Sequence, residues 1–386
     1  MTQTFAPLRP EVTDMGENGL GSPTLGSPDW TGQFADPREF DTELTVRRVV
    51  PITHDVTSFV FDPPPGRTLV FEPGQHIVVQ VPVSGEILER CYTISSPPTR
   101  PGSLTITVKR HPDGPVSNWL HDHVRPGDRL RVRGPHGAFT YRDDPAMPSA
   151  GLPSGGYLFL SAGSGITPLM SMTRTLLDEG SQADVVFVHS ARTPADIIFR
   201  RELDALAEGG LPLRVIHVCE EDSVGERWHG ARGRLSADLL RWAVPDVAER
   251  QVFLCGPPGY MNAVKAILVE LGVPDDRVHV ETFTIAEAPP AAPAPDAAGL
   301  RRRVELRRSG KVVDCDETVT VLDALMQAGV LLRSSCRQGM CGTCKSTLLE
   351  GEVDMQHQGG IRQREIDRGS FLPCCSYPRS DLVIDA

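Results

Sequence analysis

Between residues 43 and 150, short apolar stretches alternate with polar positions, and turn-forming residues separate them. Alternation with a period of two is typical of strands with one buried face, and pairs such as Pro73-Gly74 and Pro126-Gly127 favour turns. Six such strands with regular turns indicate an antiparallel six-stranded β-barrel domain. We expect the strands at Leu44–Val50, Val56–Phe61, His76–Val81, Ile87–Ile94, Leu104–Lys109 and Leu130–Arg133, and one helix at Val116–His123.

From residue 151 to 285 the pattern changes to continuous apolar runs that alternate with helical periodicity. Buried strands followed by helices are typical of an α/β domain with a parallel sheet and helices on both faces. The strands are expected at Tyr157–Ser161, Val185–His189, Leu213–Cys219, Val252–Cys255 and Val278–Glu281. The helices are expected at Pro168–Glu179, Ile197–Glu208, Ala237–Trp242 and Tyr260–Leu271.

The two remaining low-complexity stretches divide the rest of the chain. Residues 1–42 are rich in Gly, Pro, Ser and acidic residues, which predicts a disordered or surface arm. Residues 286–299 alternate alanine and proline and predict a semi-stiff linker. Beyond this linker, the pattern of residues 300–386 predicts a hairpin around Ser309-Gly310. It also predicts a helix that starts at Thr320, and Asp323 can cap the first turn of this helix.

The cysteines of this last domain carry its chemistry. Cys336, Cys341 and Cys344 have the spacing C-x4-C-x2-C, and Cys374 follows thirty residues later. This is the plant-type [2Fe–2S] spacing, in which four thiolates hold two irons. A zinc site is the alternative, but zinc sites usually show paired short spacings. Cys375 competes for the fourth position, but residues 372–378 resemble the end of plant-type ferredoxins, where the ligand stands four residues before a proline, and this resemblance selects Cys374.

Composition narrows the function classes further. The net charge is −11, which argues against nucleic acid as a partner. We find no apolar run long enough to span a membrane and no secretory signal pattern. Nine cysteines, four of them assigned to a cluster, suit a reducing environment, so we expect a cytoplasmic protein.

A one-electron cluster needs an electron donor, and the barrel carries a candidate flavin site. Arg90, Tyr92 and Thr93 offer a cation for phosphates, an aromatic face for the ring system and a hydroxyl for the ribityl chain; the simpler alternative is an ordinary barrel strand. The sequence resembles the R-x-Y-[ST] motif of ferredoxin–NADP reductases. A helix start at Gly114-Pro115 offers N–H groups to a pyrophosphate, which favours FAD over FMN. The predicted FAD ligands also include Ser95, Lys109, Val116 and Ser117.

The parallel-sheet domain carries a candidate dinucleotide site. Gly163 and Gly165 lie between a strand and a helix, which Thr167 is expected to cap and Pro168 to begin. The segment Cys255-Gly256-Pro257 resembles the C-G-P motif that lies beside the nicotinamide in the same family. By this resemblance, Cys255, Tyr92 and Phe283 are the catalytic residues, and Arg192 lies near the adenosine ribose. Glu220, Glu221 and Asp222 would repel a 2′-phosphate, so NADH is preferred over NADPH.

The motifs follow one another in a fixed order from residue 43 to 386. In this order they resemble the reductase components of Rieske-type oxygenases, with the last domain similar to the β-grasp fold of plant-type ferredoxins. The resemblance implies that NADH reduces FAD, that the [2Fe–2S] cluster takes electrons singly, and that a Rieske-type oxygenase accepts them. A quaternary ammonium compound is one candidate for the oxygenase's substrate. The alternatives are another acceptor (a hybrid-cluster protein, a haem monooxygenase or a desaturase) or a non-catalytic redox sensor.

Overall fold

The fold is taken from a computed structural model of the chain. It describes residues 40–142, 156–209, 212–282 and 300–386, apart from 331, 333–338, 340, 341, 343, 358, 359 and 362. The predicted arm up to residue 39 and the predicted linker at 286–299 therefore lie outside the described residues.

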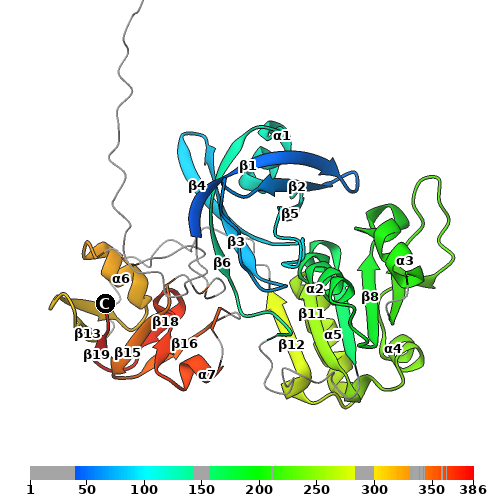
Figure 1. Cartoon of the computed structure of the whole chain (residues 1–386). Helices are drawn as coiled ribbons and strands as arrows, with labels where there is room; N and C mark the ends of the chain where they lie inside the picture. Colours follow the sequence, from blue (N-terminus) through cyan, green and yellow to red (C-terminus); the bar gives the residue numbers. More distant parts are fainter. Residues whose placement is uncertain are drawn as a thin grey trace, which may run out of the picture. The chain divides into compact units, whose positions relative to one another are not determined.

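The first domain is a six-stranded antiparallel sheet that curls on itself (Figure 1). Its strands are β1 (Phe40–Pro51), β2 (Val56–Asp62), β3 (His76–Val83), β4 (Glu86–Thr93), β5 (Leu104–Lys109) and β6 (Arg129–His136), in the order β4-β3-β6-β1-β2-β5. Just past the end of edge strand β4, Ile94 bridges to Ile106 of the other edge strand, so the curled sheet nearly closes. Helix α1 (Pro115–His123) buries Val116 and Leu120 in the barrel core. All six predicted strands are present, and the first begins at Phe40, which is buried.

The second domain is a six-stranded parallel sheet in the order β10-β9-β8-β7-β11-β12. The strands are β7 (Tyr157–Ala162), β8 (Val185–Ala191), β9 (Leu213–Cys219), β10 (Ala231–Arg232), β11 (Gln251–Gly256) and β12 (Val278–Thr282). The helices are α2 (Ile166–Asp178), α3 (Arg200–Glu208), α4 (Ala237–Ala243) and α5 (Pro258–Glu270). The five predicted strands are confirmed, and β10 adds a two-residue edge that the pattern did not reveal.

One apolar core joins the two domains. The face of the parallel sheet that α2 and α3 cover is lined by Tyr157, Phe159, Phe187 and other aromatic and branched side chains. The same cluster includes Val56, Phe139 and Tyr141 of the first domain, all buried. The opposite face packs against α4 and α5 in a separate cluster. The first two domains therefore share buried apolar surface, although the sequence divides them near residue 150.

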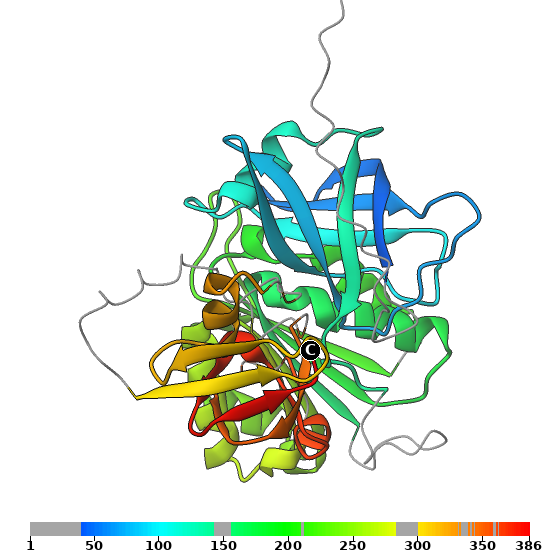
Figure 2. The same cartoon turned by 90° about the vertical axis from the view of Figure 1, so that its left-hand side faces the viewer.

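The C-terminal domain has a five-stranded mixed sheet in the order β14-β13-β19-β15-β17 and a separate hairpin of β16 and β18 (Figure 2, yellow to red). Its strands are β13 (Arg301–Leu306), β14 (Val312–Asp316), β15 (Ser346–Glu350), β16 (Val353–Met355), β17 (Ser370–Phe371), β18 (Ser376–Pro378) and β19 (Leu382–Ile384). Helix α6 (Val321–Gln327) begins after Thr320, whose hydroxyl accepts from the Asp323 amide at 3.2 Å and donates to its carboxylate at 2.7 Å. A short helix, α7 (Gln363–Ile366), completes the domain.

None of the helices in the described ranges is both long and apolar enough to cross a membrane.

Candidate functional site

The predicted flavin strand is β4, and its three motif residues differ in burial. Thr93 is 5% exposed, whereas Arg90 and Tyr92 are half-buried. The Tyr92 ring packs against the barrel core, and burial raises the pKa of its phenol well above the ordinary value. The ring therefore stays neutral and can serve as a flat packing surface. Arg90 donates to the Glu89 carbonyl at 2.7 Å through one nitrogen.

Two other predicted flavin ligands already have protein partners. The Ser95 side chain is fully buried, and its hydroxyl lies 2.9 Å from the Thr107 hydroxyl and 3.2 Å from the Thr105 carbonyl. The Lys109 ammonium lies 2.9 Å from the Asp55 carboxylate. These contacts hold the barrel together, so Ser95 and Lys109 have structural roles that the sequence did not indicate, and their part in flavin binding stays a prediction.

The N-terminus of α1 leaves room for a ligand to approach its backbone closely. Gly114 is its N-cap and no side chain caps the helix, so the first-turn N–H groups point away from the helix. A Cβ on Gly114 would lie 2.5 Å from the Ser117 hydroxyl, which accepts from the His111 amide at 3.1 Å. This arrangement fits an anion such as the predicted FAD pyrophosphate. Val116 is buried in the core, so only its backbone can face such a ligand.

The predicted dinucleotide loop packs closely against the backbone at the end of β11. Gly163 has φ +52°, and a Cβ on Gly165 would lie 2.3 Å from the Cys255 carbonyl oxygen. Only glycine fits there. The expected cap by Thr167 is wrong: α2 starts at Ile166 after Gly165, and the Thr167 hydroxyl donates to the Ser164 carbonyl at 3.0 Å. Pro168 is the third helical residue rather than the first. No side chain caps α2, and its first N–H, that of Ile166, already donates to the Gly163 and Ser164 carbonyls, so a pyrophosphate at this end would be bound by the other N–H groups of the loop and the first turn.

The predicted nicotinamide segment lies at the end of β11. Cys255 and Gly256 are buried, and Pro257 is the exposed N-cap of α5. A Cβ on Gly256 would meet the Tyr260 ring at 2.8 Å. Burial, with a smaller effect of Glu281, raises the pKa of the Cys255 thiol well above its ordinary value, so the thiol is protonated. Phe283, the third predicted catalytic residue, lies outside the described residues.

A row of polar side chains crosses the parallel sheet at this level. Strand register pairs Glu281 with Cys255, Cys255 with Ser161, Ser161 with His189, and His189 with His217. Paired residues of neighbouring strands project from the same face. We call these five residues the cross-strand row. Most of these residues are the last of a predicted buried strand. Because the strands are parallel, this shared position could have predicted from the sequence that the polar side chains lie side by side.

Burial sets the protonation of the cross-strand row. Glu281 is 7% exposed, and desolvation raises its pKa to about 8. The fully buried His189 has its pKa lowered to about 3, first by burial and then by the nearby His217 and Lys109. Its Nδ1 lies 2.7 Å from the Ser161 hydroxyl. At neutral pH the row therefore holds a protonated carboxyl, a thiol and a neutral imidazole in a dry layer.

Two of the three carboxylates that follow β9, Glu220 and Asp222, have arginine partners. Glu220 lies 3.3 Å from Arg234, and Asp222 lies 2.5 Å from Arg232. These ion pairs weaken the predicted repulsion between the carboxylates and a 2′-phosphate. Arg192 is mostly exposed and lies 3.4 Å from Asp196.

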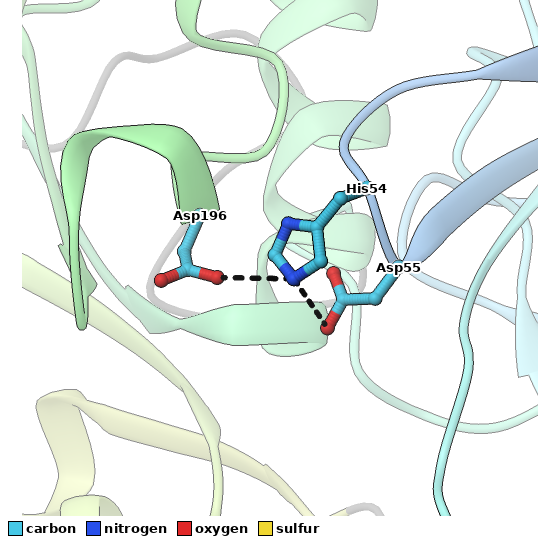
Figure 3. Close-up of side chains that lie close together, drawn as sticks. All are labelled: His54, Asp55 and Asp196. Carbon is cyan, nitrogen blue, oxygen red and sulfur yellow. Dashed lines mark ion pairs between the residues drawn. The ribbon is translucent and has the colours of Figure 1, made fainter. Parts of the chain in front are cut away.

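His54, Asp55 and Asp196 lie together between the first two domains (Figure 3). The His54 Nε2 atom is 3.8 Å from Asp55 and 3.9 Å from Asp196. The Lys109 ammonium already neutralises Asp55, and Thr193 donates to Asp196 from its amide and hydroxyl at 3.1 and 2.8 Å. The cluster is therefore a charged contact between domains and a poor metal site.

The described part of the cluster loop fits a thiolate-bound cluster. Cys344 and Cys374 are buried in one side-chain cluster around Leu322 and Leu372. The Gly339 amide donates to the Cys374 sulfur at 3.3 Å, whereas the Cys375 thiol donates to the Leu372 carbonyl at 3.5 Å. Gly339 has φ +70°, and a Cβ there would lie 2.6 Å from the Cys375 sulfur. Cys336 and Cys341 lie outside the described residues.

Comparison with known proteins gives the same three parts in the same order. The chain matches the family models of the oxidoreductase FAD-binding domain (residues 43–141), the oxidoreductase NAD-binding domain (159–266) and the 2Fe-2S iron-sulfur cluster binding domain (304–379). It is 40% identical over 351 residues to the glycine betaine monooxygenase reductase subunit of Pseudomonas aeruginosa, covering 88% of this chain and 93% of that protein. The chain belongs to the family of oxygenase reductase components.

Two solved structures resemble the reductase. An intact type IV self-sufficient cytochrome P450 monooxygenase matches with a TM-score of 0.70 and 26% identity, over 90% of the reductase and 41% of that chain. Phthalate dioxygenase reductase matches with a TM-score of 0.52 and 24% identity, over 90% and 98% of the two chains, which shows a common fold. The reductase is therefore an oxidoreductase with FAD-, NAD- and [2Fe–2S]-binding domains that serves an oxygenase system.

Proposed function

We propose that the protein takes electrons from NADH and delivers them singly to a Rieske-type oxygenase in the cytoplasm. The observation that carries this proposal is the close approach of Gly165 to the Cys255 carbonyl, with a Cβ position only 2.3 Å from that oxygen. It brings the proposed pyrophosphate loop to the residue proposed to face the nicotinamide. Bound FAD would accept a hydride from NADH and release the electrons one at a time to the [2Fe–2S] cluster.

We also propose the cofactor ligands, and the geometry of the site supports them. Arg90, Tyr92 and Thr93 would hold the flavin, with the N–H groups of Val116 and Ser117 at its pyrophosphate. The glycine loop and α2 would hold the NADH pyrophosphate, with Arg192 near the adenosine. The other proposed residues of the dinucleotide site are Gly163, Gly165, Thr167, Pro168, Cys255, Gly256 and Pro257. The cluster ligands would be Cys336, Cys341, Cys344 and Cys374.

The protein's own groups orient the reactants and keep water away. The protonated Cys255 thiol supplies a small, neutral surface beside the nicotinamide site, because burial suppresses its ionisation. The half-buried Tyr92 ring supports the flavin site from the barrel. Glu281 retains a proton up to pH of about 8 next to Cys255, so a proton is stored at the inner end of the dinucleotide site.

The relative named as a glycine betaine monooxygenase reductase subunit supports an oxygenase that acts on a quaternary ammonium compound. Plant-type clusters have potentials near −400 mV and Rieske centres at roughly −150 mV or above. A drop of about 250 mV makes each electron transfer favourable by about 6 kcal/mol, which supports a Rieske centre as the acceptor. A haem monooxygenase is the second candidate, because a P450 monooxygenase chain contains a region of the same architecture.

The proposal is tested by mixing the loaded protein with NADH and following flavin and cluster absorbance in a stopped-flow instrument. We expect flavin reduction before cluster reduction, release of FAD rather than FMN on denaturation, and a catalytic efficiency with NADH at least tenfold above that with NADPH. Equal efficiency with both nucleotides would end the NADH preference. Electron delivery to a purified Rieske oxygenase, compared with delivery to a P450, distinguishes the two acceptors.

A further inference from the structure

One face of α2 is bound to the segment that follows the flavin strand. Ser171, Arg174 and Asp178 are spaced i, i+3 and i+7, so they lie on one side of the helix. All three contact residues 95–100 of the barrel domain, which begin two residues after β4 ends. The Ser171 hydroxyl donates to the Ser96 carbonyl at 2.8 Å. Asp178 accepts from Arg100 at 2.6 and 2.8 Å.

Arg174 is the central contact of this face. Its side chain is 11% exposed, and its Nη1 donates to the Ser95 carbonyl at 2.5 Å. The other two nitrogens bind the Glu202 carboxylate of α3 at 2.7 Å each. The guanidinium also lies over the Phe199 ring, with 4.7 Å between its carbon and the ring centroid. A planar fork that binds a carboxylate in a bidentate manner has little freedom, so Arg174 fixes the Ser95 carbonyl relative to two helices.

Ser95 is held equally firmly from the other side. Its amide donates to the Thr105 carbonyl at 2.8 Å, and its hydroxyl contacts Thr107 of β5 at 2.9 Å. The residue lies only three positions after Tyr92. Any movement of α2 along its axis is therefore transmitted through the Ser95 carbonyl to the end of the flavin strand.

The N-terminus of the same helix is the proposed dinucleotide loop. Gly165 immediately precedes α2 and lies against Cys255, and Arg174 lies in the third turn. The helix thus connects the place where the nicotinamide nucleotide would bind to the segment that follows the strand on which the flavin would lie. A 1 Å change between a hydride donor and its acceptor is enough to lower a transfer rate by about 100-fold.

We propose that Arg174 is a positioning residue for hydride transfer: it locks α2 to the Ser95 carbonyl and thereby sets the distance between nicotinamide and flavin. This inference rests on the proposed function, because it assumes that NADH reduces flavin bound at Tyr92. Arg174 itself would touch neither cofactor. Its effect is on geometry, so it alters the transfer step more than nucleotide affinity.

The experiment uses the full-length holoprotein with Arg174→Lys, Arg174→Leu and Ser171→Ala. Single-turnover flavin reduction is measured against NADH concentration, with NADH and with NADH deuterated at the transferred position. We expect Arg174→Leu to lower the limiting reduction rate 10- to 100-fold, with less than a threefold change in the half-saturating NADH concentration. The long-wavelength absorbance of the nicotinamide–flavin complex should weaken, and the deuterium isotope effect should rise. Arg174→Lys should recover part of the rate.

Arg241→Leu is the matched control, because Arg241 of α4 forms exposed ion pairs with Asp238 of the same helix and with Glu270 of α5. It should reduce flavin at the wild-type rate. If Arg174→Leu loses FAD or does not fold, Ser171→Ala decides, with an expected three- to tenfold loss of rate. Wild-type rates and isotope effects in the folded Arg174 variants would overturn the inference, as would a wild-type rate in Ser171→Ala when Arg174→Leu does not fold. Failure of NADH to reduce the wild-type flavin would instead refute the proposed function.

Discussion

At the scale of single residues, two buried acidic groups lie side by side at the end of the parallel sheet. Glu281 and the Cys255 thiol lie on adjacent strands, and both are protonated at neutral pH because burial disfavours their charged forms. The sequence identified Cys255 by its motif. It did not assign a role to Glu281, because burial depends on strands that are distant in the chain and has no local pattern.

The raised pKa of Glu281 predicts a specific pH dependence of stability. In the unfolded chain this carboxyl loses its proton near the ordinary value of 4.5, whereas the native protein keeps it until about pH 8. The native state binds more protons between these values, so the free energy of unfolding should fall as pH rises from about 4.5 to 8 and level off above. Glu281→Gln should lack this component, which is on the order of a few kcal/mol.

Denaturant unfolding of the wild type and Glu281→Gln at a series of pH values measures the difference. Glu43→Gln is a suitable control because Glu43 is exposed on β1. A stability difference between wild type and Glu281→Gln that does not change from pH 5 to 8 would show that the carboxyl is solvated in solution.

The adjacent thiols near the C-terminus give a second residue-scale prediction. The Gly339 amide is directed at the Cys374 sulfur, while the Cys375 thiol is engaged with the Leu372 carbonyl. Cys374→Ser should therefore abolish the cluster's visible absorbance and leave flavin reduction by NADH intact. Cys375→Ser is the matched control and should keep the cluster. The opposite result for the two variants would reassign the fourth ligand to Cys375.

At the scale of elements, periodicity predicted which strands and helices form but not how they end. The expected helix from Ile197 starts at Arg200, because Phe199 adopts φ +57° and interrupts the turn. Strand β10 has only two residues, too few for a periodic signal. Threonine is a residue type that often caps helices, but Thr167 lies inside α2, and the glycine loop leads into the helix without a side-chain cap. Contacts such as that of Gly165 with Cys255 arise only when the sheet is assembled.

The junction between the glycine loop and β11 provides the third prediction. In Gly165→Ala the new methyl group would lie 2.3 Å from the Cys255 carbonyl, so α2 or β11 must move. Overpacking of this kind costs about 1–3 kcal/mol. We expect at least a tenfold lower NADH-dependent flavin reduction, measured as the rate at limiting NADH. Gly102→Ala, where a Cβ meets nothing within 4 Å, should behave as wild type. An unimpaired Gly165→Ala would mean that this contact does not shape the dinucleotide site.

At the scale of the whole molecule, acidic charge is unevenly distributed. The chain carries −11, but residues 300–386 contain thirteen Lys and Arg against twelve Asp and Glu. Many of these charges pair within the domain. The pairs include Arg302–Glu317, Arg308–Asp385, Lys345–Glu365 and Arg379–Asp354. A [2Fe–2S] cluster with four thiolates adds a formal charge of about −2. The electron-delivering domain is thus nearly neutral.

We therefore predict that electron delivery to the partner depends only weakly on salt, since steering by opposite charges is what falls steeply with ionic strength. The measurement is the second-order rate of partner reduction from low to high salt. The control is a variant with added acidic charge, Arg307→Glu, which should steepen the dependence. A loss of tenfold or more in the wild type between about one and three times physiological ionic strength would reveal a local charge patch that controls docking.

The apolar core that joins the first two domains limits how such reductases can be recombined. A chimaera cut between residues 142 and 156 would separate Phe139 and Tyr141 from the aromatic residues they pack against, and would leave the Ser95 carbonyl without Arg174. Each half would then expose apolar surface that is buried in the native protein. We therefore expect a chimaera to keep this surface buried only when its flavin and dinucleotide domains come from the same protein.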